Sequence, residues 1–309
     1  MNYMDTIDRR PLVAIHCFVY NHEPYLRDCF EGFVMQQTNF PFVAIVHDDA
    51  SMDGSAVIIR EYEEKYPHIF KPIYETENQY SKRDGSLDRI MDEAINATGA
   101  KYVAMCEGDD YWTDPLKLQK QVDFMEANSE YSMCFHGALV KNELGYVEDY
   151  DCTFITPKDY TAQELFTHWI VPTASIVYKK DIVHAYPIVN GEWMITGDVC
   201  LVAKCATVGK VRGMTDVMSV YRLNLASLVH SEQYNYNKIM KHPEHFMSFY
   251  YSFPNLRKEV KWCLSQAYYA RFKRGQTSFP QKILDLIKSI YYQPSFVIHK
   301  ITNAIFRMQ

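Results

Sequence analysis

Residues 42–55 read FVAIVHDDASMDGS, and this stretch decides the fold class. Residues 42–47 form a short apolar run, which predicts a buried strand. The run ends abruptly at Asp48 and Asp49, and the polar stretch after them opens a helical pattern that ends at Pro67. A buried strand that leads through a polar turn into a helix is the repeating unit of a parallel α/β sheet.

The same alternation continues on both sides of this stretch. Apolar runs predict further strands at 12–18, 70–74 and 102–106, and helical spacing predicts helices between Pro24 and Thr38, at 85–97 and at 116–128. The pattern then loosens into shorter strands at 132–140 and 175–178 and helices at 198–208 and 256–273. The sequence therefore predicts an α/β fold: a doubly wound, mostly parallel, mixed sheet flanked by helices, with a helical C-terminal extension.

The composition is that of a globular protein. Of 309 residues, 48% are hydrophobic and 23% are charged, which excludes disordered, collagen-like and disulfide-scaffold classes. The net charge of −6 lacks the basic balance of a dedicated nucleic-acid binder, so no nucleic-acid partner is expected. The longest clean apolar run, 40–46, is far shorter than the roughly 20 residues that span a bilayer.

The cysteines predict a reducing environment. The eight cysteines are scattered through apolar stretches, and no pair has the C-x-x-C spacing of a zinc or redox site. Buried free thiols are the expectation. The N-terminus carries charged residues and no segment of signal-peptide form, so we expect a cytoplasmic protein.

The first acidic cluster joins Asp48 and Asp49 to the segment Asp53-Gly54-Ser55. Asp and Ser before a helix are ordinary N-cap residues. Two adjacent carboxylates are more than a cap needs, and a carboxylate at the end of a parallel strand can accept a hydrogen bond from a ribose hydroxyl or a base N–H. Both interpretations stay open on spacing alone.

The second acidic cluster, Glu107-Gly108-Asp109-Asp110, follows directly after the predicted strand at 102–106. Like charges about 4 Å apart repel by about 4 kcal/mol at an effective dielectric of 20. A divalent cation relieves this repulsion, and Mn²⁺ or Mg²⁺ prefers carboxylate oxygens and is readily shared with substrate phosphates. The alternative is a solvated acidic turn before Trp112.

Three segments resemble the N-terminal blocks of family 2 inverting glycosyltransferases, in the same order and spacing. They are Phe18-Val19-Tyr20-Asn21, Val46 to Ser55, and Cys106-Glu107-Gly108-Asp109-Asp110-Tyr111-Trp112. The resemblance covers residues 10–230 and implies a GT-A fold with a nucleotide-sugar site. It implies that Tyr20 and Asn21 lie by the nucleotide and that Asp49 hydrogen-bonds the base.

The same resemblance assigns the metal and diphosphate residues. Glu107 and Asp109 stand at the metal-binding D-x-D position, with Glu replacing the usual first Asp, and Asp110 beside them is assigned to substrate binding. After the third strand the family tends to have glycines and an Arg-Asn pair, which this chain lacks. Lys82 or Arg83 could meet the diphosphate there, or both could be exposed loop cations.

Two later segments complete the resemblance. Trp193 to Leu201 is similar to the family's acidic block, with Asp198 at the position of the general base and Gly197 in place of the usual first acid. An aspartate that opens a helix is also an ordinary cap. Tyr221 to Ser227 is similar to the block that closes over the diphosphate, which implies a role for Arg222.

The C-terminal segment 271–309 has seven Lys and Arg against one acid, Asp285, and apolar residues recur there at helical spacing. A basic amphipathic stretch is typical of a membrane-surface element, so a peripheral position on the inner face of the membrane is one expectation. Docking onto the catalytic domain is the other. Within His242-Pro243-Glu244-His245, the proline predicts a surface turn rather than a zinc-binding helix.

The resulting hypothesis is a metal-dependent inverting glycosyltransferase with a catalytic domain at 1–230 and a helical, basic region at 231–309. The expected donor is a nucleotide-diphosphate sugar, foremost a UDP-sugar. The expected acceptor is a sugar or a lipid-linked hydroxyl in cell-surface polysaccharide or glycolipid synthesis. The alternatives are a catalytically silent nucleotide-sugar-binding or scaffold subunit and a sugar nucleotidyltransferase. Residues 19–27 lack the glycines that a nucleotidyltransferase usually places after its first strand.

Overall fold

The structure is a computed structural model that describes residues 10–143, 150–151, 155–167, 170–182, 197–224 and 232–306. The chain divides into two compact units. Unit 1 comprises Met1–Tyr160, Ile170–Ala185 and Lys204–Leu223, and unit 2 comprises Thr161–Trp169, Tyr186–Ala203 and Asn224–Gln309. The domain boundary expected at residue 230 stays a prediction.

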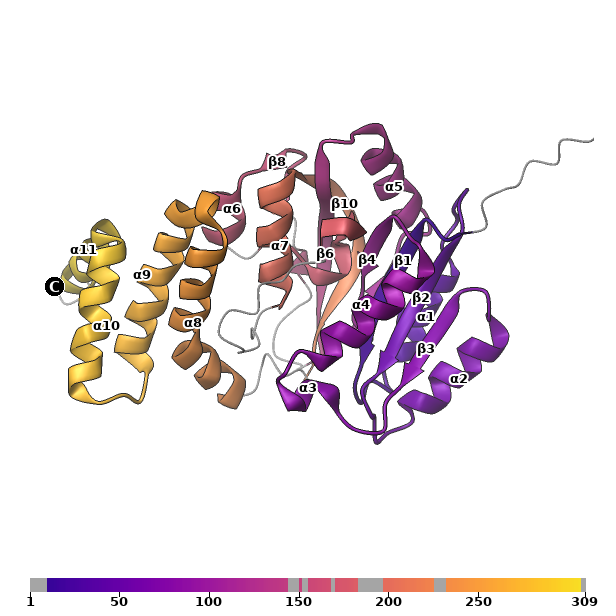
Figure 1. Ribbon diagram of the computed structural model, residues 1–309, viewed down its shortest axis with the longest axis horizontal. Coiled ribbons are helices and arrows are strands. Elements are labelled where there is room, and N and C mark those ends of the chain that lie inside the picture. The colour runs from indigo at the N-terminus through magenta and orange to yellow at the C-terminus, as the bar shows by residue number, and fades with distance from the viewer. Residues whose placement is uncertain are drawn as a thin grey trace, which may run out of the picture. The chain divides into compact units, whose positions relative to one another are not determined.

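Unit 1 is a sheet with helices packed against it (Figure 1). Its strands are β1 (Val13–Val19), β2 (Phe42–Asp48), β3 (Phe70–Tyr74), β4 (Tyr102–Met105), β5 (Tyr111–Trp112), β6 (Tyr131–Asn142), β7 (Tyr150–Asp151), β8 (Asp159–Tyr160), β9 (Val177–Lys179) and β10 (Lys210–Leu223). Its helices are α1 (Leu26–Val34), α2 (Ser55–Lys65), α3 (Gln79–Lys82), α4 (Ser86–Thr98) and α5 (Lys117–Ala127), and α7 (Gly197–Val208) contributes residues to both units.

The described strands form one sheet in the order β3-β2-β1-β4-β9-β6-β10-β5, with β7 on β6 and β8 on β10. Strands β1 to β4 run parallel, β9 is antiparallel to β4 and to β6, and β10 is parallel to β6. It follows that β10 runs in the same direction as β1 to β4. The carboxyl ends of β1 to β4, β6 and β10 therefore lie at one edge of the sheet.

The core of unit 1 explains why the apolar runs became strands. Val13, Ile15 and Cys17 of β1 are completely buried, as expected for a parallel strand covered on both faces. Phe30 of α1 packs edge-on against Phe70 of β3 with ring centroids 4.9 Å apart. The same cluster continues through α1 to Trp112 of β5, so the core reaches from one side of the sheet to the acidic turn.

The predicted fold class is confirmed, and the predicted strands at 12–18, 42–47, 70–74 and 102–106 match β1 to β4 within one or two residues. The long strand β10 was not predicted. Among the described residues, seven cysteines are free and buried, as expected, and Cys152 lies outside those residues. None of the helices in the described part of the chain is long and apolar enough to cross a bilayer.

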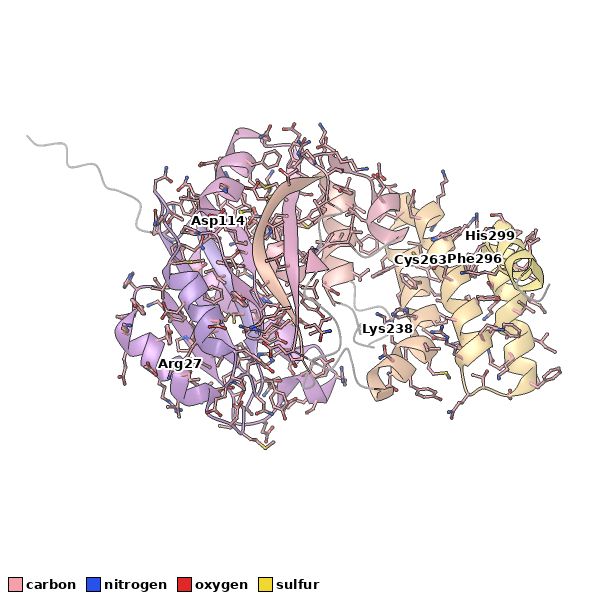
Figure 2. All side chains as sticks on the ribbon, turned by 180° about the vertical axis from the view of Figure 1, so that it is seen from behind. Arg27, Asp114, Lys238, Cys263, Phe296 and His299 are labelled. Carbon is pink, nitrogen blue, oxygen red and sulfur yellow. The ribbon has the colours of Figure 1, made fainter. Side chains whose placement is uncertain are left out.

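Unit 2 is helical. It contains α6 (Ala162–Thr167), the first residues of α7, α8 (Glu232–Ser252), α9 (Arg257–Arg274), α10 (Phe279–Tyr292) and α11 (Pro294–Phe306). Figure 1 shows α8, α9 and α10 side by side, and Figure 2 labels Cys263 on α9 and Phe296 on α11. A core cluster joins Cys200 and Ala203 of α7 to Phe249 of α8 and Leu264 of α9.

The turn expected at Pro243 is wrong, because α8 continues through this proline. A proline inside a helix leaves carbonyl groups of the preceding turn without their usual N–H partner. Here the guanidinium of Arg271 donates to the carbonyl oxygen of Met240 at 3.0 Å and to the carboxylate of Glu244 at 2.6 Å. Tertiary hydrogen bonds from α9 therefore support the helix where the local sequence disfavours it.

Candidate functional site

The loops at the carboxyl edge of the unit 1 sheet bring together all the predicted site residues except Asp198. This set consists of Tyr20, Asn21, Asp49, Lys82, Arg83, Glu107, Asp109, Asp110 and Arg222. Ligands of parallel sheets bind at this edge because the strands end there and the following loops supply the side chains.

The loops after β1 and β2 are tied to each other by hydrogen bonds. Asn21 donates its backbone N–H to Ser51 Oγ at 3.0 Å, and its side-chain oxygen accepts the N–H of Met52 at 2.8 Å. Both Asn21 and Ala50 have positive φ angles, 56° and 61°. A positive φ is tolerated by asparagine and is strained for alanine, and such strain is concentrated at functional loops. Asn21 thus fixes the shape of both loops.

Tyr20, immediately before Asn21, is 41% exposed although Val19, the last residue of β1, is only 1% exposed. An exposed aromatic ring at the end of a strand can stack against a nucleotide base. The position is therefore consistent with the nucleotide contact that the sequence predicts for Tyr20.

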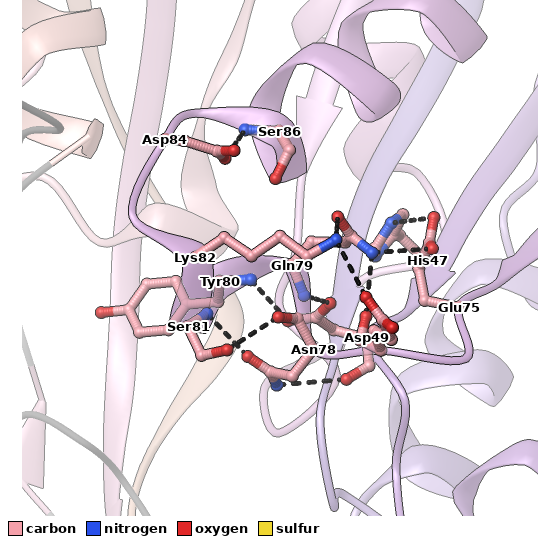
Figure 3. Close-up of polar contacts among 11 residues, drawn as sticks. His47, Asp49, Glu75, Asn78, Gln79, Tyr80, Ser81, Lys82, Asp84 and Ser86 are labelled. Atoms are coloured by element: carbon pink, nitrogen blue, oxygen red, sulfur yellow. Dashed lines mark hydrogen bonds and ion pairs between the residues drawn. The ribbon is translucent and has the colours of Figure 1, made fainter. Parts of the chain in front are cut away.

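Asp49 is buried and ties the end of β2 to the segment that follows β3. Its two carboxylate oxygens accept the backbone N–H groups of Gln79 at 2.6 Å and Tyr80 at 3.0 Å. The side-chain amide of Asn78 also donates to the Asp49 carbonyl oxygen at 3.2 Å (Figure 3). Asp49 therefore supports the start of α3 together with the N-cap residue Asn78, a role that its sequence position alone did not reveal.

Lys82 and Arg83 end α3 at the same edge. Lys82 Nζ donates to Gln79 Oε1 at 2.9 Å and lies 3.4 Å from Glu77, and its side chain is 39% exposed (Figure 3). Arg83 has a φ of 57°, and its guanidinium lies 4.0 Å from the centroid of the Tyr80 ring. Both cations are held by contacts within their own segment.

The second acidic cluster forms a tight turn after β4. The N–H of Asp110 donates to the carbonyl oxygen of Glu107 at 3.1 Å, and Gly108 donates to the carbonyl oxygen of Phe18 in β1 at 3.0 Å. Glu107 and Asp109 are half-buried, whereas Asp110 is 2% exposed. Burial, with the charges of Asp109 and Glu107 nearby, raises the pKa of Asp110 well above its usual value.

Arg222 of β10 holds this turn. Its backbone N–H donates to Asp110 Oδ1 at 2.9 Å, and its guanidinium donates to the carbonyl oxygen of Asp109 at 3.0 Å. The guanidinium is 1% exposed, pairs with Asp28, lies 3.2 Å from Glu143 and stacks over Tyr111 at 4.4 Å. Arg222 is thus a buried support of the acidic turn, with two carboxylates to neutralise its charge.

His22 is a residue of this edge that sequence reasoning missed. A Cβ atom added at Gly108 would lie 2.7 Å from His22 Nδ1, so the imidazole packs directly on the acidic turn. Burial lowers the pKa of His22, and the nearby carboxylates of Asp109, Asp53 and Asp48 oppose that effect. The only signal in the sequence was its place in the polar segment after β1.

Glu107 and Asp109 fit a divalent cation that is shared with a substrate. Within the described ranges, no three His, Cys, Asp or Glu side chains are grouped to hold a metal ion. Mg²⁺ is usually bound by one or two carboxylates together with substrate phosphates, so two carboxylates suffice in that arrangement. Burial is the main cause of the raised pKa of Asp110, and the charges of Asp109 and Glu107 add to it; a cation at the turn would relieve the part that comes from these charges.

Asp198 lies in unit 2, in the first turn of α7. Its Oδ1 accepts the N–H of Val199 at 2.8 Å. Burial raises the pKa of Asp198, and that hydrogen bond together with the charge of Lys238 opposes the shift. A carboxylate with a raised pKa is a better proton acceptor than an ordinary exposed aspartate.

The sheet and the acidic turn at its carboxyl edge define a GT-A fold. Solved structures agree: S. aureus TarS in complex with UDP-GlcNAc matches with a TM-score of 0.62 at 14% identity, covering 91% of this chain and 81% of that chain. PcManGT, a mannosyltransferase from Pyrobaculum calidifontis in complex with GDP-Man and Mn²⁺, matches with a TM-score of 0.53 at 18% identity, covering 92% and 82%.

The chain belongs to the family described as Glycosyl transferase family 2, whose model matches residues 15–183. The resemblance found in the sequence is thereby confirmed.

Two relatives match most of the length of this chain. An uncharacterized protein of Mycobacterium tuberculosis is 32% identical over 236 residues, which cover 76% of this chain and 66% of that protein. An uncharacterized glycosyltransferase of Nostoc sp. is 25% identical over 215 residues, which cover 67% of this chain and 63% of that protein. The chain thus matches less than two thirds of the length of the relatives.

Proposed function

We propose that the chain transfers a sugar from a nucleotide-diphosphate sugar to an acceptor hydroxyl, with inversion at the anomeric carbon. Family membership supports the reaction class. The observation that carries the proposal is the acidic turn of Glu107 and Asp109, held by the buried Arg222 at the carboxyl edge of the sheet. A rigid pair of carboxylates at this edge is suited to a metal-bound diphosphate.

The donor that we propose is a UDP-sugar, with a GDP-sugar as the second choice. TarS and PcManGT, which share the fold, are bound to UDP-GlcNAc and to GDP-Man with Mn²⁺. Tyr20 would stack on the base, and Asp49 would hold the loop that encloses it. Lys82 and Arg83 supply positive charge at this edge, and Lys82 would exchange Glu77 for a phosphate oxygen.

Glu107 and Asp109 would hold Mn²⁺ or Mg²⁺, and the bound cation supplies positive charge opposite the leaving diphosphate. Asp110 would keep the turn in shape through its bond to the N–H of Arg222. Arg222 would act as a positioning residue, because its guanidinium is already occupied by Asp28, Glu143 and the Asp109 carbonyl.

Asp198 would accept the proton of the acceptor hydroxyl as that oxygen attacks the anomeric carbon. The role requires an ionised carboxylate about 3 Å from the hydroxyl oxygen. We propose a sugar or lipid-linked acceptor in cell-surface polysaccharide or glycolipid synthesis, and a cytoplasmic protein that can associate with the membrane face where such acceptors lie.

The donor site is tested by Asp109→Asn. Calorimetric titration with UDP in the presence of Mn²⁺ should show loss of the Mn²⁺-dependent part of the affinity, with an unchanged unfolding temperature. The matched control is Asp123→Asn, the same change at an exposed position of α5. Equal UDP affinity of the wild type and the Asp109→Asn variant with Mn²⁺ would remove Asp109 from the site.

The base is tested by Asp198→Asn. Donor binding should persist while transfer falls by about 10²–10⁴-fold, because an amide cannot accept the proton. If Asp198 only caps α7, the change should have little effect, since Asn caps a helix about as well as Asp. A wild type that binds donor but transfers to no acceptor would instead favour the silent binding subunit.

A further inference from the structure

Helix α10 of unit 2 turns its apolar side outward. Each of its exposed positions is apolar, and the end residues Phe279 and Tyr291 are 75% and 77% exposed. At 3.6 residues per turn these positions fall on one face of the helix. We call this set the α10 face; it consists of Phe279, Pro280, Ile283, Leu284, Ile287, Ile290 and Tyr291.

The opposite side of α10 is polar and buried. Asp285 is completely buried and accepts two hydrogen bonds from Arg271 of α9, at 3.0 and 2.9 Å. Ser289 is also completely buried and donates to the carbonyl oxygen of Ser265 in α9 at 2.8 Å. This polarity is the reverse of that of an ordinary surface helix, which buries its apolar stripe.

The buried contacts fix the rotation of α10. Rolling the helix to cover the α10 face would separate Asp285 from Arg271 and leave a buried charge without its partner, which is strongly destabilising. The exposure of the α10 face is therefore built into the packing of α9 against α10.

Within the described residues 271–306, cations border the α10 face and no acid does. Lys282 and Lys288 are half-buried and lie on the two sides of the face, at the helical spacing that separates its edges from its buried side. Lys288 Nζ lies 5.1 Å from the centroid of the Tyr268 ring of α9, so its charge must swing away from that ring to reach a headgroup. Lys273, Arg274 and Lys300 on the adjoining segments are exposed. Asp285, the one acidic residue in 271–309, is already neutralised by Arg271.

The positive charge along the edges of the α10 face indicates which kind of partner can bind it. A second copy of the chain would bring like charges together along both edges of the face, which is unfavourable. An anionic lipid surface matches the border, because lysines place their charge at the headgroups while their stems extend along apolar surface. Aromatic side chains such as Phe279 and Tyr291 at both ends of the helix suit the same interfacial depth.

We propose that the α10 face binds an anionic lipid bilayer, with α10 lying in the plane of the interface. Ile298 of α11, 64% exposed, extends the apolar surface. The net charge of the whole chain is −6, so the attraction comes from this local cluster of cations and not from the chain as a whole. The proposal is independent of the transfer reaction, because every residue in it belongs to α9, α10 and α11.

The experiment is flotation of the full chain with phosphatidylcholine vesicles that contain no or 30% phosphatidylglycerol. The wild type should float with the anionic vesicles, and salt should weaken the binding.

The double variant Ile283→Ser/Ile287→Ser should bind about tenfold or more weakly. The variant Lys282→Gln/Lys288→Gln should lose roughly fivefold for each cation removed. Val57→Ser, at a 66% exposed position of α2, is the control and should bind as the wild type does.

Two results would overturn the proposal. One is wild-type flotation that is absent, or equal on neutral and anionic vesicles, at low salt. The other is lipid-free self-association, measured by sedimentation velocity, that disappears in Ile283→Ser/Ile287→Ser while vesicle binding does not change. The replaced isoleucines are exposed, so unfolding temperatures should match the wild type and confirm that the variants fold. UDP binding should be retained in all variants.

Discussion

Gly108 is the residue on which the acidic turn depends most directly. A Cβ atom at this position would lie 2.7 Å from His22 Nδ1, 3.0 Å from Val19 Cγ2 and 3.1 Å from Leu26 Cδ2, so the packing leaves no room for a side chain. The first of these distances is closer than real Cβ contacts, so the turn or the imidazole must move. A glycine is needed for close approach, not for an unusual φ angle.

We predict that Gly108→Ala lowers the free energy of unfolding by about 1–3 kcal/mol, the range for an overpacked site. It should also weaken Mn²⁺-dependent UDP binding, because Glu107 and Asp109 flank the displaced residue. Urea denaturation and calorimetry measure the two effects. Removing the imidazole in His22→Ala/Gly108→Ala should recover part of the stability. An alanine variant as stable as the wild type would show that the turn has room.

The raised pKa of Asp198 predicts that both the sugar-transfer rate and the stability of the protein depend on pH. Because burial raises its pKa, the carboxylate becomes ionised only at a pH above that of an ordinary aspartate, about 4. If Asp198 is the base, the transfer rate measured against pH should fall on the acid side at a pH above the ordinary aspartate pKa of about 4.

The raised pKa of Asp198 also makes the free energy of unfolding depend on pH. The folded state holds the Asp198 proton more tightly than the unfolded state, so the stability from this group is fully present below the unfolded pKa and is lost as the pH rises through the raised folded pKa. Asp198→Asn does not titrate, so its stability relative to the wild type should increase with pH over this interval. Urea unfolding of both proteins from pH 4 to 8 tests this, and parallel stability curves would contradict it.

At the residue scale, the sequence predicted side chains that the fold places at one edge of the sheet, but it could not predict what each of them contacts. Arg222 was expected at the diphosphate, yet it is buried against Asp28 and Glu143, which are far from it in the sequence. Lys117 is completely buried over the Trp112 ring at 4.1 Å, although nothing local distinguishes it from the half-buried Lys120. Such contacts depend on tertiary packing, which spacing in a single sequence does not encode.

At the scale of elements, short apolar runs located β1 to β4 because a strand buried on both faces needs apolar residues throughout. Strand β10 has no such continuous apolar run and was not predicted. Its register against β6 shifts between Lys210 and Val211 and again between Gly213 and Ser219, so apolar and polar residues follow no simple period. Helix α8 was not predicted because Pro243 disfavours a helix locally, whereas the hydrogen bonds that support it come from Arg271 of α9.

Helix α3 has four residues, too few for intrinsic stability, and it is supported by its N-cap Asn78, which accepts the N–H of Ser81 at 2.7 Å, and by Asp49. Asp49→Ala removes the acceptor for the N–H groups of Gln79 and Tyr80 at a buried position. Hydrogen bonds to a charged group are worth about 1.5–3 kcal/mol each, so we predict a loss of about 3 kcal/mol or more.

Hydrogen exchange provides the local measurement for this prediction. The amides of Gln79 and Tyr80 should exchange much faster in Asp49→Ala, while those of α5 should not change. Asp49→Asn keeps one acceptor oxygen and should show an intermediate effect. Unchanged protection at both amides would show that α3 holds its shape without Asp49.

At the scale of the whole molecule, the two units interleave along the chain. Unit 2 takes residues from before position 230, including the start of α7, and completes its core with residues from α8 and α9. Cys200 and Ala203 are buried there with Phe249, Phe253 and Leu256. A boundary at residue 230 would therefore divide one apolar core, which a boundary between independently folding domains does not do.

We predict that residues 1–230 expressed alone form a chain that aggregates, because the apolar side of α7 loses the α8 and α9 residues that cover it. Size-exclusion chromatography and thermal unfolding measure the outcome. Co-expression of residues 231–309 as a separate chain should restore a soluble complex, since it returns the missing part of the core. A monomeric 1–230 that unfolds cooperatively at the temperature of the full chain would instead support the domain boundary predicted from the sequence.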